Sequence, residues 1–203
     1  MSKYFLMSFA LAAAALAPGA YAATAWNEAL SGDLANLGSA PTAVTMGVGS
    51  NLIIGSTGRN PSGVVDRDYF SFTVAPGLQL DAITLLPATT FLGPESISFI
   101  AIQAGPRVTV DPLGNNPAGL LGWWLYSEND INTDILQLMG GSPGAVGYSG
   151  ALPAGRYSVW VQETSPGVAR YSFDFQISPV PEPAAALFML AGLAALGWRT
   201  RRS

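Results

Sequence analysis

Histidine and cysteine are absent from this 203-residue chain, and its one lysine, Lys3, lies close to the N-terminus. Without these side chains the rest of the chain cannot form Ser-His-Asp or Cys-His triads, Ser-Lys dyads, histidine-ligated zinc sites or Schiff bases. The missing cysteines also exclude disulfides, so a folded domain must rely on its apolar core. These absences remove most familiar classes of exported enzyme.

Basic side chains are scarce between residues 23 and 180. Five arginines stand there against twelve aspartates and glutamates, which gives a formal charge of −7. Nucleic acids and anionic surfaces select for clustered lysine and arginine, so we expect no nucleic acid as a partner. The acidic balance is compatible with cations or neutral glycans as ligands.

The first 22 residues have the features of a signal peptide. Lys3 precedes an apolar run over 4–16, and Ala20 and Ala22 form a small-x-small site for signal peptidase. Pro18 breaks a helix where a signal peptide needs an extended segment, although a retained N-terminal anchor is the alternative. We therefore expect export, with cleavage after Ala22.

Glycine and proline punctuate the chain that follows. The 23 glycines and 15 prolines lie between short apolar runs, a pattern typical of turns between strands. Alternation is clearest over 68–74, where Phe70, Phe72 and Val74 share one face. Strands at 43–48 and 52–56 are expected to form a hairpin with its bend at 49–51. Further strands are expected at 79–86, 96–102, 107–110, 123–126, 156–163 and 171–177.

About eight to ten strands with no helices between them favour an all-β fold, an antiparallel two-layer β-sandwich of jelly-roll type. We place this domain at 43–178, after an irregular N-terminal segment at 23–42. The glycine-rich and proline-rich interval at 111–122 is expected to be a long surface loop. A small barrel is the alternative architecture.

Three stretches resemble the bacterial pre-peptidase C-terminal domain. They are the strand and Pro-Gly turn at 66–77, the segment 152–161 and the strand start at 171–173. The resemblance implies a small non-catalytic β-sandwich that serves in adhesion, secretion or substrate binding. This chain departs from the family in standing without an attached enzyme and in a longer middle segment at 87–150.

Carboxylates are the remaining groups that could carry chemistry. Paired acids can hydrolyse glycosides, and Asp66 with Asp68, or Glu128 with Asp130 and Asp134, could supply a pair. Both groups lie beside turns, where such side chains commonly bond the local backbone or are solvated. We therefore expect no enzyme, with a carboxylate-based glycoside hydrolase as the remote alternative.

The same oxygens could bind calcium, an ion that accepts carboxylates from loops. The candidates are Asp66 and Asp68, or Glu128, Asp130 and Asp134, and Glu28 with Asp33 forms a further pair. None has the spacing of an EF-hand loop, so we expect no cofactor, with calcium as the alternative.

Aromatic residues beside the long loop suggest a glycan-binding platform formed by Trp123, Trp124 and Tyr126. Neighbouring residues of a strand face opposite sides, so at least one of the two tryptophans is expected in the core, and core packing of both is favoured over an open platform. A glycan-binding or calcium-binding β-sandwich is therefore the alternative to a purely structural domain.

The last 25 residues combine a proline boundary, an apolar run and a basic end. Pro181, Glu182 and Pro183 precede 15 apolar residues at 184–198, a helix of about 22 Å against a hydrocarbon core of about 30 Å. The prolines mark where the helix starts, and the basic end resists translocation. We therefore predict a transmembrane helix at 184–198 within a terminal unit at 179–203. The basic residues at its end are Arg199, Arg201 and Arg202.

This order of features resembles the PEP-CTERM sorting signal of Gram-negative bacteria, which an exosortase recognises and processes. The resemblance implies an exosortase as partner, an inner-membrane intermediate, and delivery to the cell envelope, outer surface or extracellular matrix. It also implies an association with exopolysaccharide or biofilm. A plain tail anchor is the alternative, in which the Pro-Glu-Pro sequence only marks a helix boundary.

Overall fold

The computed structural model describes residues 22–92 and 97–181. The predicted signal-peptide core, Ala20, the motif residues Glu182 and Pro183, the predicted membrane helix at 184–198 and the basic residues Arg199, Arg201 and Arg202 lie outside the described residues.

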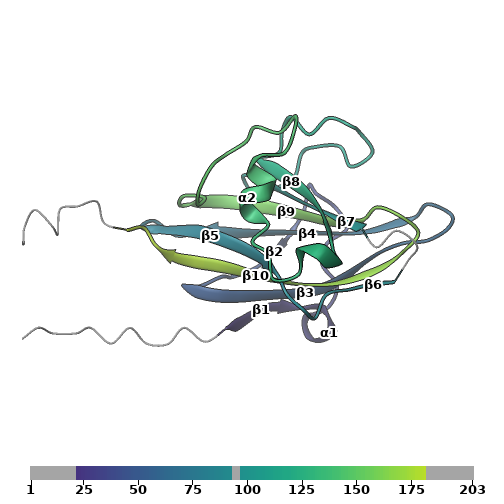
Figure 1. The fold of residues 1–203 in the computed structure, drawn as a ribbon, viewed down its shortest axis with the longest axis horizontal. Coiled ribbons are helices and arrows are strands. Elements are labelled where there is room, and N and C mark those ends of the chain that lie inside the picture. The colour runs from purple at the N-terminus through teal and green to yellow at the C-terminus, as the bar shows by residue number, and fades with distance from the viewer. Residues whose placement is uncertain (1–21, 93–96, 182–203) are drawn as a thin grey trace, which may run out of the picture.

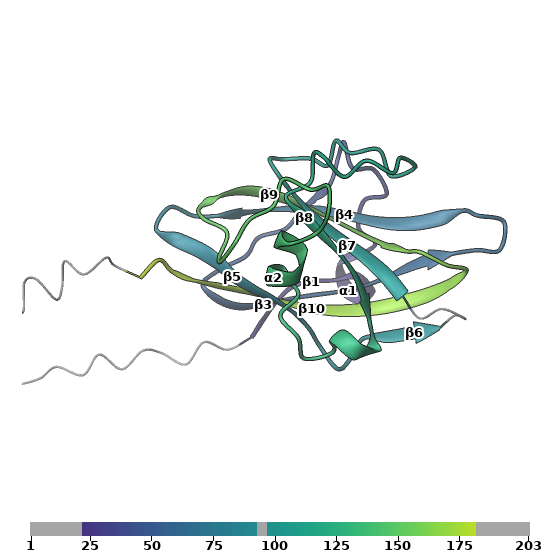
Figure 2. The same cartoon turned by 45° about the horizontal axis from the view of Figure 1, so that its top comes forward.

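Ten strands form one sheet within the described residues, and this sheet curls over so that it packs against itself as two layers (Figures 1 and 2). The first layer contains β1 (Ala23–Asn27), β3 (Gly49–Arg59), β10 (Gly167–Pro179), β5 (Leu78–Leu85) and β6 (Thr90–Leu92). The second contains β2 (Thr42–Ala43), β4 (Val65–Val74), β9 (Gly155–Glu163), β7 (Ile97–Ala104) and β8 (Gly122–Ser127).

Strand β4 carries the chain from one layer to the other. Its first residues pair with the end of β3, at Gly58 with Asp66, and from Arg67 onward it pairs with β9. The order of neighbouring strands is β3–β10–β5 in the first layer and β4–β9–β7–β8 in the second. Bridges from 131–134 to β5 extend the row β3–β10–β5 by one further segment on the far side of β5. This is jelly-roll connectivity, so the predicted all-β antiparallel sandwich is confirmed.

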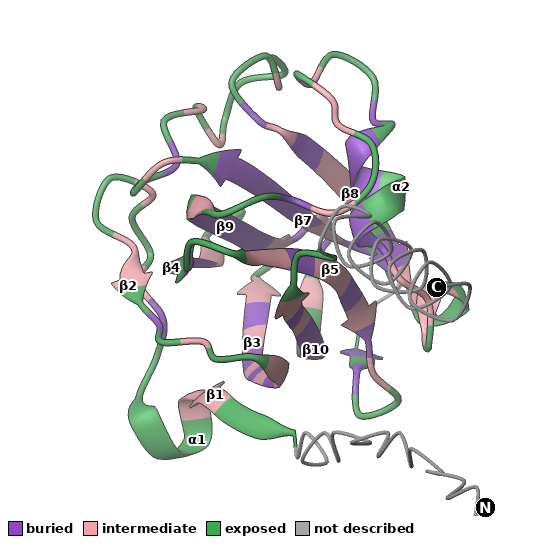
Figure 3. Cartoon of the chain, turned by 90° about the vertical axis from the view of Figure 1, so that its left-hand side faces the viewer, coloured by how far each residue is buried: buried purple, intermediate pink, exposed green. Residues whose placement is uncertain are grey.

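The core lies between the layers. The alternation of β4 sends Phe70 and Phe72 inward, where both meet Phe175 of β10 edge to face, with ring centroids 5.7 and 5.6 Å apart. Buried residues lie along the strands, and exposed ones gather in the loops (Figure 3). Each buried phenylalanine contributes about 1.5–3 kcal/mol of hydrophobic free energy.

Helices are short. They are α1 (Glu28–Ser31), the 3-10 turn η1 (Glu128–Asp130) and α2 (Leu136–Gly140), whose Leu136 and Met139 pack into the core. No helix in 22–92 or 97–181 has the length and apolar character needed to cross a membrane.

The predicted hairpin at 49–51 is wrong. Thr42 and Ala43 pair in parallel with β4 in the second layer, whereas Gly49 already begins β3 in the first. The buried Asn51 amide fixes this entry, because it accepts the Gly47 N–H and donates to the Gly47, Gly49 and Phe175 carbonyls. The chain therefore crosses between layers here and does not reverse within one.

Two further segments differ from expectation. The N-terminal segment is not irregular throughout, because β1 pairs in parallel with β3. Residues 107–110 form a loop, in which Val108 N–H donates to Gly38 O and Thr109 N–H donates to the Gln103 side chain. The backbone groups of both segments form hydrogen bonds with residues distant in the sequence or with side chains. A local sequence pattern cannot reveal such partners.

Both ends of the described region lie at one end of the sandwich. Ala23 pairs with Asn51, and Asn51 pairs with Phe175, close to the end of β10. The strands around both ends run out toward the same side in Figure 1.

Candidate functional site

A groove of about 590 Å³ lies on the outer face of the second layer, where residues of the loops before and after β8 line it. We call it the aromatic groove. Phe99 of β7, Trp123 of β8 and Trp160 of β9 form its floor, and Gln162, Asn115 and Asn116 contribute amide groups. These strands are neighbours in the order β9–β7–β8, so period-two alternation places the three rings on one face.

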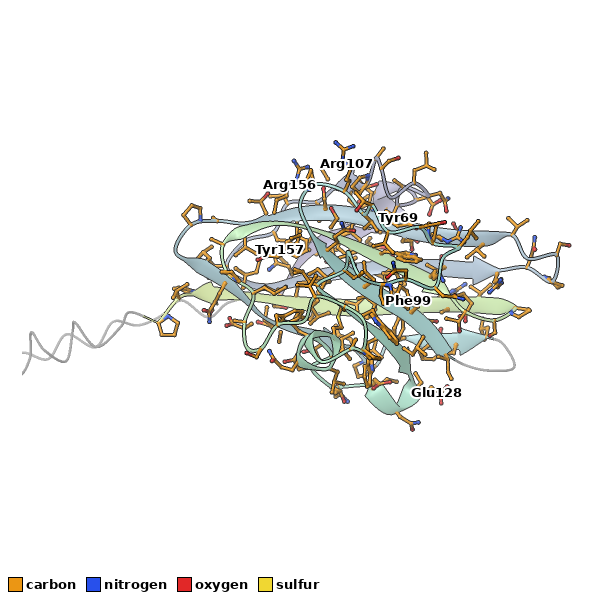
Figure 4. The ribbon with its side chains drawn as sticks, turned by 90° about the horizontal axis from the view of Figure 1, so that it is seen from above. Tyr69, Phe99, Arg107, Glu128, Arg156 and Tyr157 are labelled. Carbon is orange, nitrogen blue, oxygen red and sulfur yellow. The ribbon has the colours of Figure 1, made fainter. Side chains whose placement is uncertain are left out.

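The rings form a continuous row. Phe99 stacks on Trp123 at 6.2 Å between centroids and meets Trp160 edge to face at 4.7 Å. Trp160 in turn stacks on Tyr69 of β4 at 5.9 Å. Tyr69 and Phe99 lie in the same half of the molecule in Figure 4. Edge-to-face and stacked pairs of this kind hold the rings rigid.

The groove is largely apolar, with a few amide groups and no charge among its described residues. Trp123 Nε1–H donates to Pro143 O at 3.2 Å, which fixes its ring. The Trp160 side chain is buried, and its Nε1–H has no acceptor among the described residues. Of the described residues that line the groove, none carries a charge. Aromatic faces with amide donors and acceptors suit a neutral polyhydroxylated ligand.

The predicted platform is only partly present. Trp123 lies in the aromatic groove. Trp124 points to the opposite side of β8, packs against the main core and donates its Nε1–H to Asp130 at 3.2 Å. Tyr126 has no exposed surface and contacts Phe173 and Phe91 inside the sandwich. The prediction is therefore wrong for Tyr126, which offers no ring face to a glycan.

Two members of the groove escaped the sequence reasoning. Phe99 and Trp160 lie on strands that were predicted, but their contribution to a shared surface depends on β7 and β9 being neighbours. The local signal is the alternation in β9, where Trp160 and Gln162 fall on the side opposite Val159 and Val161. Strand order was the missing information.

A second site lies near the first layer, where α1 packs against β3. Glu28, Asp33 and Asp68 each offer one carboxylate oxygen, and these oxygens lie within 4.8 Å of one another. We call this trio the acidic corner. Asn27 caps α1 and Gly32 ends it at φ 89°, so the chain turns back and brings Asp33 beside Glu28. A pocket of about 560 Å³ lined by Glu28, Asp33, Gly55 and Tyr171 opens onto it.

Hydrogen bonds hold two of these carboxylates in place. Glu28 accepts Ser56 N–H at 2.7 Å and Leu34 N–H at 3.3 Å. Asp68 has no exposed surface and accepts the Tyr171 hydroxyl through Oδ2 at 2.6 Å, while its Oδ1 has no partner among the described residues.

Burial changes the acid–base properties of this corner. Desolvation, reinforced by the charge of Glu28, raises the pKa of Asp68 from 3.8 to about 9. Desolvation also raises the pKa values of Glu28 and of Asp66, and the charge of Asp33 adds to both shifts. The pKa of Tyr171 is raised by burial and by the neighbouring Asp68 charge. Asp68 is therefore protonated at neutral pH when no cation is near.

Two of the other predicted carboxylates are held by hydrogen bonds from backbone N–H groups. Asp130 accepts Ser127 N–H and Trp124 Nε1–H, and Asp134 accepts Ile83 N–H and Leu136 N–H. Glu128 is exposed and lies at the edge of the molecule opposite Arg107 in Figure 4. Asp66 lies outside the trio, although it belongs to the same strand as Asp68. Hence the structure brings Asp68 together with Glu28 and Asp33, a combination that the sequence reasoning did not make.

The sandwich ends abruptly at the C-terminal side. Pro179 is the last residue of β10 and pairs with Leu78, and Val180 N–H makes a last hydrogen bond to Gly77 O at 2.9 Å. Among known protein families, the PEP-CTERM protein-sorting motif matches residues 179–202. The chain carries a PEP-CTERM sorting motif. Searches of curated proteins and of solved structures gave no match.

PEP-CTERM motifs are typical of exported proteins of Gram-negative bacteria and direct them to the envelope through an exosortase. Here the PEP-CTERM match begins on the last residue of β10, so no linker separates the motif from the domain. Pro181, the first residue of the Pro-Glu-Pro sequence, is exposed. The resemblance of the sandwich to the pre-peptidase C-terminal domain stays a prediction.

Proposed function

We propose that this chain is a non-enzymatic exported protein, released by an exosortase to the cell envelope or extracellular matrix, where it associates with exopolysaccharide in a biofilm. The PEP-CTERM match at 179–202 carries the proposal. The exposed Pro181 supports it, because a processing enzyme needs an accessible peptide beside the motif. Both ends of the sandwich lie on one side, so signal peptidase and exosortase would act at the same end of the domain.

Processing can be tested in the bacterium that encodes the chain. We expect the wild-type protein to lose its C-terminal end, including Arg202, and to leave the inner membrane. Glu182→Gln should leave the tail intact and the protein in the inner membrane, whereas Glu128→Gln, the same change in an exposed residue of the sandwich, should be processed normally. Cell fractionation and intact-mass measurement give the readout. A wild-type protein that keeps Arg202 and stays in the inner membrane would instead be a plain tail anchor.

The non-enzymatic part of the proposal is supported by where the carboxylates lie. Glycoside hydrolysis needs two carboxyl groups that flank the sugar. Asp130 and Asp134 are engaged by backbone groups, and Asp68 has no exposed surface. Glu28 and Asp33 line one pocket, but with Asp68 their carboxylate oxygens lie within 4.8 Å of one another, closer than the separation of about 5–9.5 Å that glycosidase pairs use. The described lining of the aromatic groove contains no carboxylate, so a glycan held there would meet no acid or base. Incubation of the full-length chain with the bacterium's own exopolysaccharide should release no reducing ends.

The aromatic groove favours a more specific role, the binding of neutral glycan. The partly exposed rings of Phe99 and Trp123 offer apolar surface to a sugar, and the buried Trp160 ring packs against Phe99 and holds it in place. A hydroxyl-rich ligand without charge matches the amide groups of Gln162, Asn115 and Asn116.

Two neighbouring tryptophans provide a matched test. The full-length chain is assayed on immobilised exopolysaccharide from the same bacterium and with cellohexaose as a defined neutral oligosaccharide. Trp123→Ala should weaken binding by about tenfold or more, the usual cost of removing a central aromatic contact. Trp124→Ala, on the other side of β8, should bind as the wild type does if its melting curve shows that it is folded. Binding that survives Trp123→Ala would exclude the groove.

A further inference from the structure

Three carboxylates from separate segments converge at the acidic corner. Glu28 belongs to α1, Asp33 follows the turn after α1, and Asp68 belongs to β4, 35 positions further along the chain. Their oxygens lie within 4.8 Å of one another. Calcium binds oxygens at about 2.3–2.6 Å, so ligands on opposite sides of one ion are about 4.6–5.2 Å apart. One ion can therefore contact all three groups.

The innermost carboxylate lacks a partner. Asp68 has no exposed surface, its Oδ2 accepts the Tyr171 hydroxyl, and its Oδ1 has no donor among the described residues. The charges that act on it, those of Glu28, Asp66 and Asp33, are all negative. A buried carboxylate oxygen with neither donor nor cation is costly. A bound cation would coordinate this oxygen and would also offset the repulsion among the negative charges of the corner.

The surrounding groups are arranged before any ion binds. Backbone N–H groups of Ser56 and Leu34 orient Glu28 and leave further lone pairs on its oxygens. Gly55 has no side chain where a Cβ atom would lie 2.8 Å from Cδ of Glu28, so the carboxylate can approach β3 closely. The pocket lined by Glu28, Asp33 and Gly55 connects the corner with solvent.

We propose that the acidic corner is a binding site for a hard divalent cation, calcium above all, with Glu28, Asp33 and Asp68 as its protein ligands. Purely oxygen ligands disfavour copper and zinc, and a pocket with room for water suits the larger and more variable coordination shell of calcium better than the strict octahedral shell of magnesium. The ion joins the α1 segment to β4, and thus the edge of the first layer to the second. The site is separate from the aromatic groove, and its existence does not depend on the function proposed above.

Calcium itself is the probe. The full-length chain is purified in a non-ionic detergent, stripped with EDTA and titrated with CaCl2, with thermal melting and calorimetry as readouts. We expect a dissociation constant of about 0.1–1 mM, the range of extracellular calcium modules. At 10 mM calcium the melting temperature should rise by about 3–10 °C, because the ion binds the native state. MgCl2 at the same concentration should raise it less.

Variants locate the ion. Asp33→Asn, an exposed change that leaves the core intact, should lower calcium affinity at least tenfold, and Glu28→Gln and Asp68→Asn should abolish the melting shift. Glu128→Gln should bind as the wild type does. An unchanged melting temperature and no calorimetric heat at 10 mM calcium would overturn the proposal. So would a shift that survives Asp33→Asn and Asp68→Asn, or one that Glu128→Gln removes.

Discussion

Gly55 gives the acidic corner its space. In the structure a Cβ atom at this position would collide with the Tyr171 hydroxyl and lie 2.8 Å from Cδ of Glu28. The backbone conformation of Gly55 is ordinary for a strand. Glycine is therefore required here by the closeness of the neighbouring atoms and not by φ. Tyr171 is fixed to Asp68 by its hydroxyl, which leaves it little freedom to move aside.

Gly55→Ala should therefore destabilise the domain by about 1–3 kcal/mol, the usual cost of overpacking a tight site. Urea denaturation followed by circular dichroism measures the change in the free energy of unfolding. Gly58→Ala is the control on the same strand, because its nearest neighbour would be Gly167 O at 3.5 Å, an ordinary contact. Equal stabilities of the two variants would contradict the close approach at Gly55.

Asp68 makes the stability of the cation-free protein depend on pH. Its pKa is about 9 in the folded chain and near 3.8 when unfolded, so the native state holds a proton that the unfolded state releases. This contribution is fully present below about pH 4 and is lost as the pH rises through about 9. Glu28 and Asp66, whose pKa values are also raised, act in the same direction.

In EDTA the free energy of unfolding should thus fall between pH 5 and 9, by at most about 1.4 kcal/mol per pH unit for each proton. Denaturant midpoints across this range provide the measurement. Asp68→Asn keeps the shape of the protonated side chain and should flatten the slope, while Glu128→Gln should leave it unchanged. A slope that persists in Asp68→Asn would assign the effect to other groups.

At the scale of single elements, the entry of β3 is fixed by one side chain. Asn51 is buried and bonds the backbone at Gly47, Gly49 and Phe175. Asn51→Ala would leave several of these groups unsatisfied, so we expect a loss of about 2–4 kcal/mol by the usual cost of unpaired buried groups. Asn115→Ala, an exposed asparagine in a loop, should change stability by less than about 0.5 kcal/mol. Chemical denaturation of both variants tests the difference.

The strands that sequence predicted well are those with clear alternation. β4, β5, β7, β8, β9 and β10 overlap the segments expected at 68–74, 79–86, 96–102, 123–126, 156–163 and 171–177, and β3 contains the one expected at 52–56. The short strands β1 and β6 were missed and β2 was reached only at Ala43, because five residues or fewer give too little alternation and their partners are distant. The same limit hid the acidic corner, since Glu28 and Asp68 meet only through the packing of α1 on β3.

At the scale of the whole molecule, the curled sheet makes the two layers one folding unit. Phe175 of the first layer contacts Phe70 and Phe72 of the second, and β4 belongs to both layers through its pairings with β3 and β9. No disulfide can hold one layer when the other opens, because the chain has no cysteine. The layers should therefore lose their structure together.

Phe175→Ala tests this coupling. Loss of the ring should cost about 3–5 kcal/mol, as is usual for a buried phenylalanine. Far-UV circular dichroism reports the whole sheet, and tryptophan fluorescence in a Trp26→Phe, Trp198→Phe background reports Trp123, Trp124 and Trp160 of the second layer, although Phe175 lies in the first. We expect both signals to shift to the same lower urea midpoint, while Val168→Ala, an exposed change on the same strand, should shift neither. The contrary result is a fluorescence transition that stays at the wild-type urea midpoint while the circular dichroism transition shifts. The two layers would then unfold independently, and the curled sheet would not be one cooperative unit.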